Sequence, residues 1–182
     1  TGPIEYRVTP NTGQDGVLTV NSLADSASPG AGNIRFGVAG TGSNKHLFLY
    51  GTGAIAPLTL NNRQIELAGS HASPVIGNNS PQAFTINTDL LPSGTGTKTL
   101  TLQGTGAGLS TFAGKISNGT ITTLNITKTE SGTWVLTGAN TYTGPTRITG
   151  GMLIVNSLAS GGSASSIGQS TGAAGLVLAG GT

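Results

Sequence analysis

Carboxylates are the side chains of this chain best suited to chemistry, because paired acids serve glycoside hydrolysis and clustered acids bind Ca²⁺. The 182 residues contain only six of them. They are Glu5, Asp15, Asp25, Glu66, Asp89 and Glu130. Each stands alone in the sequence, so only the fold could bring two of them together. We therefore expect solvated turn residues and no catalytic site, and we do not expect an enzyme.

The two histidines are the remaining candidates for acid–base or metal chemistry. A zinc site needs several nitrogen, thiolate or carboxylate ligands, whereas this chain has His46, His71 and no cysteine. His71 lies in the segment GSHASP, which is typical of an exposed turn, and His46 follows Lys45 at the edge of an expected strand. We expect no metal and no cofactor.

Two glycine-rich segments, GTGSNK at 40–45 and GTGTK at 94–98, have the composition of phosphate-binding loops. Neither continues as Gly-Lys-Ser/Thr, and no helix is expected to follow, so they are interpreted as turns. The eight Lys and Arg residues are scattered singly rather than gathered into a basic patch. No apolar run reaches the length of a membrane span. We expect neither nucleic-acid binding nor direct membrane insertion.

The overall composition indicates which kind of secondary structure would position these side chains. Charged residues make up 8 % of the chain, compared with about 25 % in an average soluble domain. A hydrophobic share of 35 % with a formal charge of only +2 argues against disorder. Thirty-one glycines, together with many threonines, valines and isoleucines, favour short strands joined by tight turns.

Short segments in which apolar residues alternate with small or polar ones recur from end to end, and this period of two predicts strands. They are IEYRVT at 4–9, VLTV at 17–20, HLFLY at 46–50, PLTL at 57–60, QIELA at 64–68, AFTI at 83–86, KTLTLQ at 98–103, TLNITK at 123–128, TWVLT at 133–137, TRIT at 146–149, MLIV at 152–155 and GLVLA at 175–179. No stretch of useful length has helical periodicity. The sequence predicts an all-β fold.

Internal similarity selects among all-β architectures. GVLTVNSLADS at 16–26 aligns with GMLIVNSLASG at 151–161. A second pair of similar segments follows them: LFLYG at 47–51 comes after the first, and LVLAG at 176–180 comes after the second. Such long-period repetition favours coils stacked along one axis over a closed sandwich. We predict a parallel β-helix with about 20 to 25 residues per coil, hence about seven to nine coils.

The only tryptophan lies in SGTWVLTGANTYTG at 131–144. Trp134 and Leu136 share one face of a predicted strand, Gly138 marks the next corner, and Asn140 and Tyr142 follow it. Asparagine can bond to backbone groups in a turn, and tyrosine offers a ring with a polar end. We expect Trp134 and Tyr142 to fix one corner of a coil. Most other aromatic residues alternate like core residues rather than forming an exposed row for sugars.

The segment from Lys128 to Val155, KTESGTWVLTGANTYTGPTRITGGMLIV, resembles the passenger-associated transport repeat of secreted bacterial autotransporter passengers. The features that carry this resemblance are Gly132, Trp134, Leu136, Gly138, Asn140, Thr141, Tyr142, Gly144, Thr146, Ile148, Gly151, Leu153 and Val155. Pro145 and Arg147 depart from the small polar residues that are common at their positions.

The resemblance implies a right-handed parallel β-helix carried to the cell surface or beyond. It also implies that the repeat supports passenger folding or transport and has no chemistry of its own. We expect residues 1–182 to form a single solenoid segment, an excerpt of a longer repetitive chain, with the clear repeat at 128–155.

Three functional hypotheses follow. The first is an extracellular structural scaffold, such as a stalk or fibre, which could associate with itself by end-to-end stacking. The second is an adhesin module that recognises a host protein or glycan through loops such as 24–33 or 69–82, because recognition usually lies on loops of a rigid scaffold. The third and most remote is a polysaccharide-acting enzyme.

Overall fold

A computed structural model describes residues 5–6, 16–25, 32–36, 46–68, 73–172 and 175–180. Within these ranges the chain forms strands, turns and loops and no helix, so the all-β prediction is confirmed. The strands are β1 (Glu5–Tyr6), β2 (Gly16–Val20), β3 (Ile34–Phe36), β4 (His46–Tyr50), β5 (Leu58–Leu60), β6 (Ile65–Leu67), β7 (Pro74–Asn78), β8 (Phe84–Ile86), β9 (Leu90–Pro92), β10 (Thr97–Gln103), β11 (Ser110–Phe112), β12 (Thr123–Lys128), β13 (Thr133–Leu136), β14 (Thr146–Ile148), β15 (Met152–Val155) and β16 (Leu176–Leu178). No described helix is long and apolar enough to cross a membrane.

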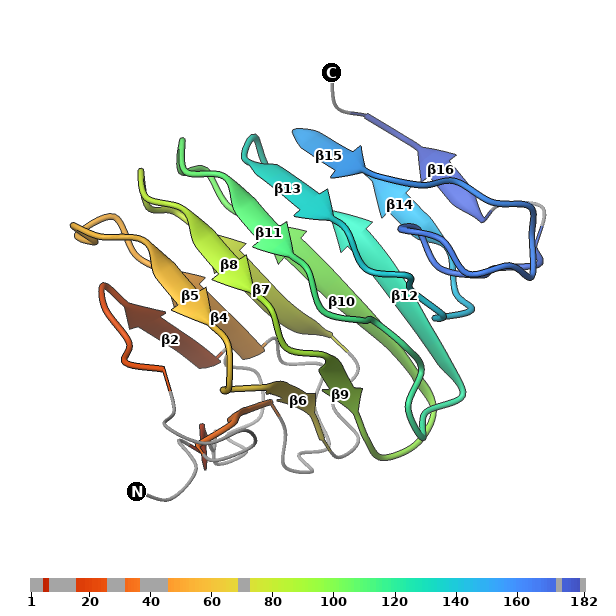
Figure 1. Ribbon diagram of the computed structural model, residues 1–182, viewed down its shortest axis with the longest axis horizontal. Coiled ribbons are helices and arrows are strands. Elements are labelled where there is room, and N and C mark those ends of the chain that lie inside the picture. Colours follow the sequence, from red (N-terminus) through yellow and green to blue (C-terminus); the bar gives the residue numbers. More distant parts are fainter. Residues whose placement is uncertain are drawn as a thin grey trace.

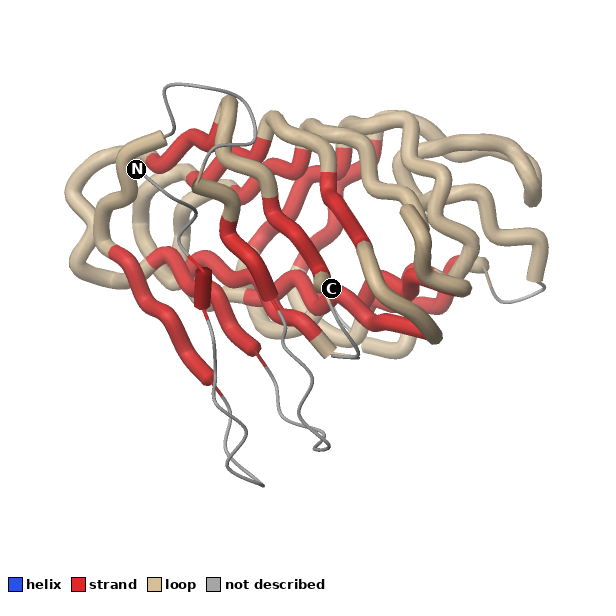
Figure 2. The backbone as a smooth tube through the Cα atoms, turned by 90° about the horizontal axis from the view of Figure 1, so that it is seen from below, coloured by secondary structure: helices blue, strands red, loops and turns tan. Residues whose placement is uncertain are grey.

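The strands stack into three parallel sheets, which we name A, B and C (Figure 1). Sheet A has the order β1-β3-β6-β9, sheet B the order β16-β14-β12-β10-β7-β4-β2, and sheet C the order β15-β13-β11-β8-β5. Successive strands of the chain fall in different sheets, so each coil visits the sheets in turn. Figure 2 shows the strands on opposite walls of an elongated body, with loops at its corners. The predicted parallel β-helix is confirmed.

The spacing of the coils differs from the prediction. Leu58 pairs with Phe84, and Phe84 with Ser110, so the chain advances 26 residues per coil along these strands. Steps of 30 residues occur as well, as between Gly16 and His46. The coils are thus mostly longer than the 20 to 25 residues expected, and the solenoid makes about five turns rather than seven to nine. Turns and corners, which have no fixed length, account for the extra residues.

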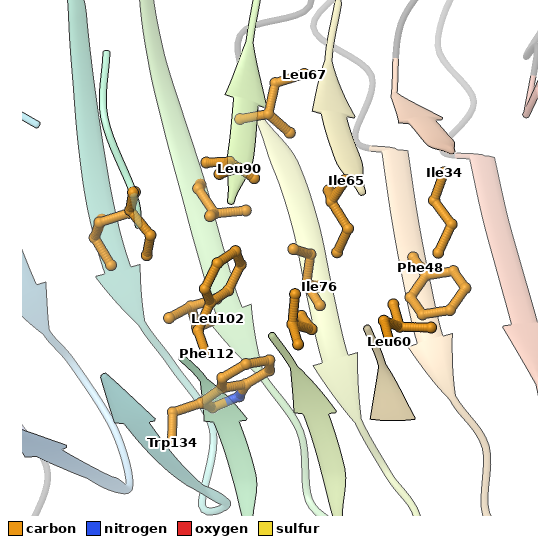
Figure 3. Packing of buried hydrophobic residues seen from close by; sticks show 14 of the residues in the cluster. Ile34, Phe48, Leu60, Ile65, Leu67, Ile76, Leu90, Leu102, Phe112 and Trp134 are labelled. Atoms are coloured by element: carbon orange, nitrogen blue, oxygen red, sulfur yellow. The ribbon is translucent and has the colours of Figure 1, made fainter. Parts of the chain in front are cut away.

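Alternation along the strands produces the core, because neighbouring side chains of a strand point to opposite faces. In β4 and β8, every second residue is buried and those between are half-buried. Inward residues of successive coils then lie above one another: Phe84, Ser110, Trp134 and Leu153 form one such column in sheet C. Figure 3 shows Trp134 and Phe112 directed into the same interior as Ile76.

Sheet A ends at β9, and the later coils close their third side differently. Between β11 and β12 the chain forms no strand, yet Ile116 and Ile121 are buried there and complete the core. In the next coil Tyr142 takes the corresponding interior place. The core therefore stays continuous although the backbone pattern of one wall changes.

The two aligned segments at 16–26 and 151–161 do not occupy equivalent places. β2 lies in sheet B, whereas β15 lies in sheet C. The second pair does agree, because β4 and β16 both belong to sheet B. The first alignment misled because alternating strands with a polar corner suit any wall of a solenoid, so similarity alone does not identify the wall.

Candidate functional site

The acidic side chains are connected to neighbouring coils. The Asp25 carboxylate accepts hydrogen bonds from three successive backbone N–H groups, of Asn61 at 2.8 Å, Asn62 at 3.0 Å and Arg63 at 3.0 Å. The guanidinium of Arg63 donates in return to the carbonyl oxygens of Ala24, at 2.9 Å, and Gly32. Asp25 therefore fastens one turn of the solenoid to the next.

Two further acids act in the same way at a spacing of 26 residues. Asp89 accepts from the N–H of Lys115 at 2.7 Å, and Glu130 accepts from the N–H of Gly104 at 2.9 Å. Both side chains are at exposed residues. The expectation of solvated turn residues was thus incomplete, because these carboxylates also satisfy backbone donors of an adjacent coil.

The acids that the structure describes do not assemble into a reactive cluster. Glu66 lies 3.4 Å from the Nε of Arg35 in a partly exposed ion pair and bonds to Ser93 at 3.4 Å. Among the residues that the structure describes, no three His, Asp or Glu side chains are grouped to hold a metal ion. The side chains of Glu5 and Asp15 lie outside the described residues.

His46 lies at the beginning of a strand, as the sequence indicated. His46 opens β4, which lies inside sheet B between β2 and β7, and the residue is only 4 % exposed. Its neighbours in register are Gly16 and Pro74, two residues that leave room for an imidazole in the column. His71 lies outside the described residues.

Trp134 occupies the centre of the core. It is fully buried, and its indole Nε1–H donates to the carbonyl oxygen of Gln103 at 2.9 Å. Its ring lies edge-on to Phe84, with 6.0 Å between ring centroids and 73° between planes. Phe84 in turn packs against Phe48 and Tyr50 at 6.0 and 5.9 Å. One tryptophan therefore joins an aromatic cluster that spans several coils and two sheets.

Tyr142 fixes the following corner. Its hydroxyl donates to the Oγ1 of Thr146 at 2.5 Å, and Thr146 donates to the carbonyl oxygen of Ile167 at 3.2 Å. The backbone of Gly168 lies against the ring, so that a Cβ there would approach a ring carbon within 2.7 Å, and its φ of +81° also favours glycine. Burial raises the pKa of the Tyr142 hydroxyl, which therefore stays protonated in the folded chain.

Asn140 links three successive coils. Its Oδ1 accepts from the N–H of Ile116 in the coil before, and its Nδ2 donates to the carbonyl oxygen of Ser166 in the coil after, both at 2.8 Å. The residue is fully buried. Because all of these groups are backbone partners in the interior, an apolar side chain at 140 would leave them unsatisfied.

Residues 126–155 match the family model of the passenger-associated-transport-repeat. This segment is a passenger-associated transport repeat. The chain is 34 % identical over 177 residues to "Adhesin BmaC autotransporter" of Brucella suis biovar 1 (strain 1330), a match that covers 94 % of this chain and 5 % of that protein. The chain thus spans about a twentieth of the length of this relative. No solved structure matches the chain.

The comparisons confirm the resemblance of the chain to autotransporter passenger repeat proteins. Within the passenger repeat, Leu136 is fully buried, and Leu153 and Val155 are partly buried against the core. The repeat glycines Gly132, Gly138 and Gly144 lie where the chain passes close to carbonyl oxygens of the preceding coil. At Gly144 a Cβ would come within 2.3 Å of the carbonyl oxygen of Leu124, so no larger residue fits without moving the backbone.

Lys128 is a repeat residue whose role the sequence reasoning missed. It is fully buried, and its Nζ donates to the carbonyl oxygens of Thr129, Glu130 and Gly150 at 2.5, 2.9 and 3.2 Å. Burial lowers the pKa of the ammonium, and the nearby Glu130 carboxylate opposes that shift. Gly151 borders this cage with a φ of +63°. The sequence contained a signal for this burial, because Lys128 alternates in phase with Leu124 and Ile126 along β12 and therefore points inward as they do.

Proposed function

We propose that this chain is a rigid, non-catalytic scaffold segment of a bacterial surface adhesin. The observation that carries the proposal is the series of polar side chains that bond one coil to the next, often 26 residues apart. These bonds occupy the acids and amides that a catalytic site would need. They also hold the coils in one register, which suits a surface that must present contacts at fixed distances.

The adhesive part of the proposal is supported by the relative named as an adhesin and by the passenger repeat itself. Autotransporter passengers act outside the cell that makes them, so we place this chain at the bacterial cell surface or in the extracellular medium. The two loops expected to recognise a host molecule, 24–33 and 69–82, are described only in part, because 26–31 and 69–72 lie outside the described residues. Recognition of a host protein or glycan remains part of the proposal.

Display of the chain on a non-adherent bacterium tests this function directly. We expect bacteria carrying the chain to bind host cells, and bacteria carrying an unrelated β-solenoid of similar length to bind much less. Surface exposure is checked by antibody labelling of intact cells. Equal binding by both strains would refute the adhesive function.

The non-catalytic part is tested separately, on a panel of neutral and acidic polysaccharides. We expect no cleavage products from any of them. Cleavage that disappears in Asp89→Ala or Glu66→Ala would replace the scaffold reading with the enzyme hypothesis.

A further inference from the structure

Residues 156–167, which follow β15, form a closed loop that the repeat itself does not explain. In Figure 1 this segment runs outward from the stacked coils at the C-terminal end. Ser157 and Ser166 close its base: the N–H of Ser166 donates to the Oγ of Ser157 at 3.1 Å, and the two hydroxyls are 3.3 Å apart. Residues 158–164 between them are exposed. The loop is therefore anchored at its base and accessible at its tip.

A half-open cavity of about 210 Å³ lies between this loop and β16. The residues that line it include the polar Ser160, Gln169 and Ser170 and the apolar Ile167 and Leu176. None of the described residues that line it is charged. A charged ligand group would lose hydration there without gaining an ionic partner, and that exchange is unfavourable. The lining favours a neutral occupant that combines hydroxyl groups with an aliphatic face.

Several of these polar groups remain available to a ligand. Ser165, at the cavity wall, already donates to the carbonyl oxygen of Gly168 at 2.8 Å. Ser170 Oγ accepts only the N–H of Gly172 at 3.3 Å, so its hydroxyl hydrogen is left over. The side-chain amide of Gln169 has no hydrogen bond within the described residues, while its backbone N–H is fixed to the carbonyl oxygen of Tyr142 at 2.9 Å. The repeat thus holds Gln169 in place by its backbone and leaves its amide free.

We propose that this cavity binds one neutral sugar ring, as the end of an uncharged glycan. A cavity of about 150 Å³ accommodates benzene, so the present volume has room for a six-membered ring with hydroxyl substituents. The amide of Gln169 can donate and accept, Ser160 and Ser170 add hydroxyls, and Ile167 and Leu176 face the C–H groups of a ring. The proposal rests on the adhesive function above and names its ligand class.

The test uses the complete 182-residue chain, labelled for amide NMR. The probes are the methyl glycosides of glucose, galactose, mannose and N-acetylglucosamine, with glucuronic acid as a charged ring of similar size. The site is small and lacks an aromatic platform, so we expect a Kd on the order of millimolar. At least one neutral sugar should shift the amide signals of Ile167, Gln169 and Ser170, and glucuronic acid should bind about tenfold more weakly or not at all.

Two variants assign the binding to this cavity. Gln169→Ala removes the free amide, and Gly172→Val adds volume to the wall at a glycine whose Cβ would have only Ser170 Oγ nearby, at 3.7 Å. Each should weaken sugar binding at least about tenfold, because each removes a contact or fills the space. Gln103→Ala, at a half-buried glutamine of sheet B, is the matched control and should bind as the unchanged chain does. Absence of shifts with every sugar, equal binding of glucuronic acid, or equal binding by Gln169→Ala and Gln103→Ala would overturn the proposal.

Cell binding separates this inference from the proposed function. If bacteria displaying Gln169→Ala adhere as well as those displaying the unchanged chain, the adhesive function stands and the cavity is not its site. Undiminished adhesion to host cells whose surface glycans have been removed enzymatically would likewise identify a protein partner and overturn the sugar site. If the unchanged chain does not adhere, the adhesive function itself fails, whatever the sugar titrations show.

Discussion

Trp134 and Phe84 are in contact although a complete strand lies between them. β13 and β8 both pair with β11, and the residue of β11 in register with both rings is Ser110. Neighbouring strands lie about 4.8 Å apart, so two rings in one column would be about twice that distance apart if they stood upright. The small Ser110 lets them approach to 6.0 Å. A short side chain in the middle coil is therefore what permits the contact.

Enlarging Ser110 should break this arrangement. Ser110→Leu places a branched side chain between two buried rings, and overpacking of this kind costs about 1 to 3 kcal/mol of unfolding free energy. Urea unfolding followed by Trp134 fluorescence measures the loss and also reports a change around the indole. Thr111→Leu is the control, because Thr111 points outward from the same strand and should change stability by less than about 0.5 kcal/mol. Equal stability of the two variants would contradict the proposed role of Ser110.

Glu130 provides a second test, because it combines an unfavourable backbone conformation with a useful bond. Its φ of 58° is the left-handed region, which costs an L-residue about 1 kcal/mol or more. Its carboxylate accepts the N–H of Gly104 from the preceding coil. Glu130→Ala keeps the strain and loses the bond, whereas Glu130→Gly loses both. We expect the glycine variant to be more stable than the alanine variant by about 1 kcal/mol.

Thermal or chemical unfolding of these two variants and of Glu130→Gln decides the point. Glutamine retains an acceptor oxygen and should remain nearest to the unchanged chain. An alanine variant as stable as the glycine variant would show that residue 130 does not adopt a positive φ.

The buried ammonium of Lys128 predicts a larger effect. Lys128→Met retains most of the side-chain volume but leaves the carbonyl oxygens of Thr129, Glu130 and Gly150 without their donor. An unsatisfied buried polar group costs about 1 to 3 kcal/mol. We therefore expect Lys128→Met to lower the free energy of unfolding by an amount in that range. Lys115→Met, at an exposed lysine, is the matched control. Similar stability of the two variants would mean that the cage contributes nothing.

Tyr142 makes stability depend on alkaline pH. Its pKa is raised by burial, so above pH 10 the unfolded chain loses this proton while the folded chain keeps it. The unfolded state is then favoured, and the unfolding free energy falls by up to about 1.4 kcal/mol per pH unit until the folded-state pKa is reached. Tyr142→Phe lacks this ionisation. The stability advantage of the unchanged chain over Tyr142→Phe should therefore shrink as the pH rises above 10.

Guanidinium unfolding at pH 8 and at several alkaline values measures that difference. Thr146→Val is the control, because it removes the partner of the hydroxyl but keeps the tyrosine, and it should retain the alkaline loss. A constant difference between the unchanged chain and Tyr142→Phe across the range would show that the hydroxyl is not protected from ionisation.

The wall-building elements were predictable from sequence, whereas the bonds between coils were not. Alternation in TLNITK and TWVLT placed β12 and β13 correctly, because side-chain parity is a local property. The partners of Asp25, 36 to 38 residues away, depend on the length of the intervening coil. That length is set by corners whose residue number varies, and the same uncertainty made the predicted coils too short. For the same reason the sequence did not show that His46 lies inside sheet B, since its strand neighbours are distant in sequence.

End-to-end stacking stays a prediction, and β16, the last described strand of sheet B, offers a way to test it. Leu178 pairs with Ile148 in the column of the buried Lys128, so it points inward, yet it is 75 % exposed. β16 carries no charged residue, and uncharged edge strands accept further pairing. A further coil can continue the sheet there, whether it belongs to a longer chain or to a second copy, and contacts of the second kind extend into filaments.

Electron microscopy and sedimentation across concentration test this stacking. We expect the unchanged chain to form longer assemblies as its concentration rises, and Leu178→Lys to remain shorter, because a charge buried between coils is costly. Leu91→Lys is the matched control, since Leu91 points outward from β9 with 37 % exposed, and the substitution places the same charge on a side wall. Assemblies that shorten equally in both variants would indicate lateral contacts instead. A chain that stays monomeric at every concentration would exclude self-stacking.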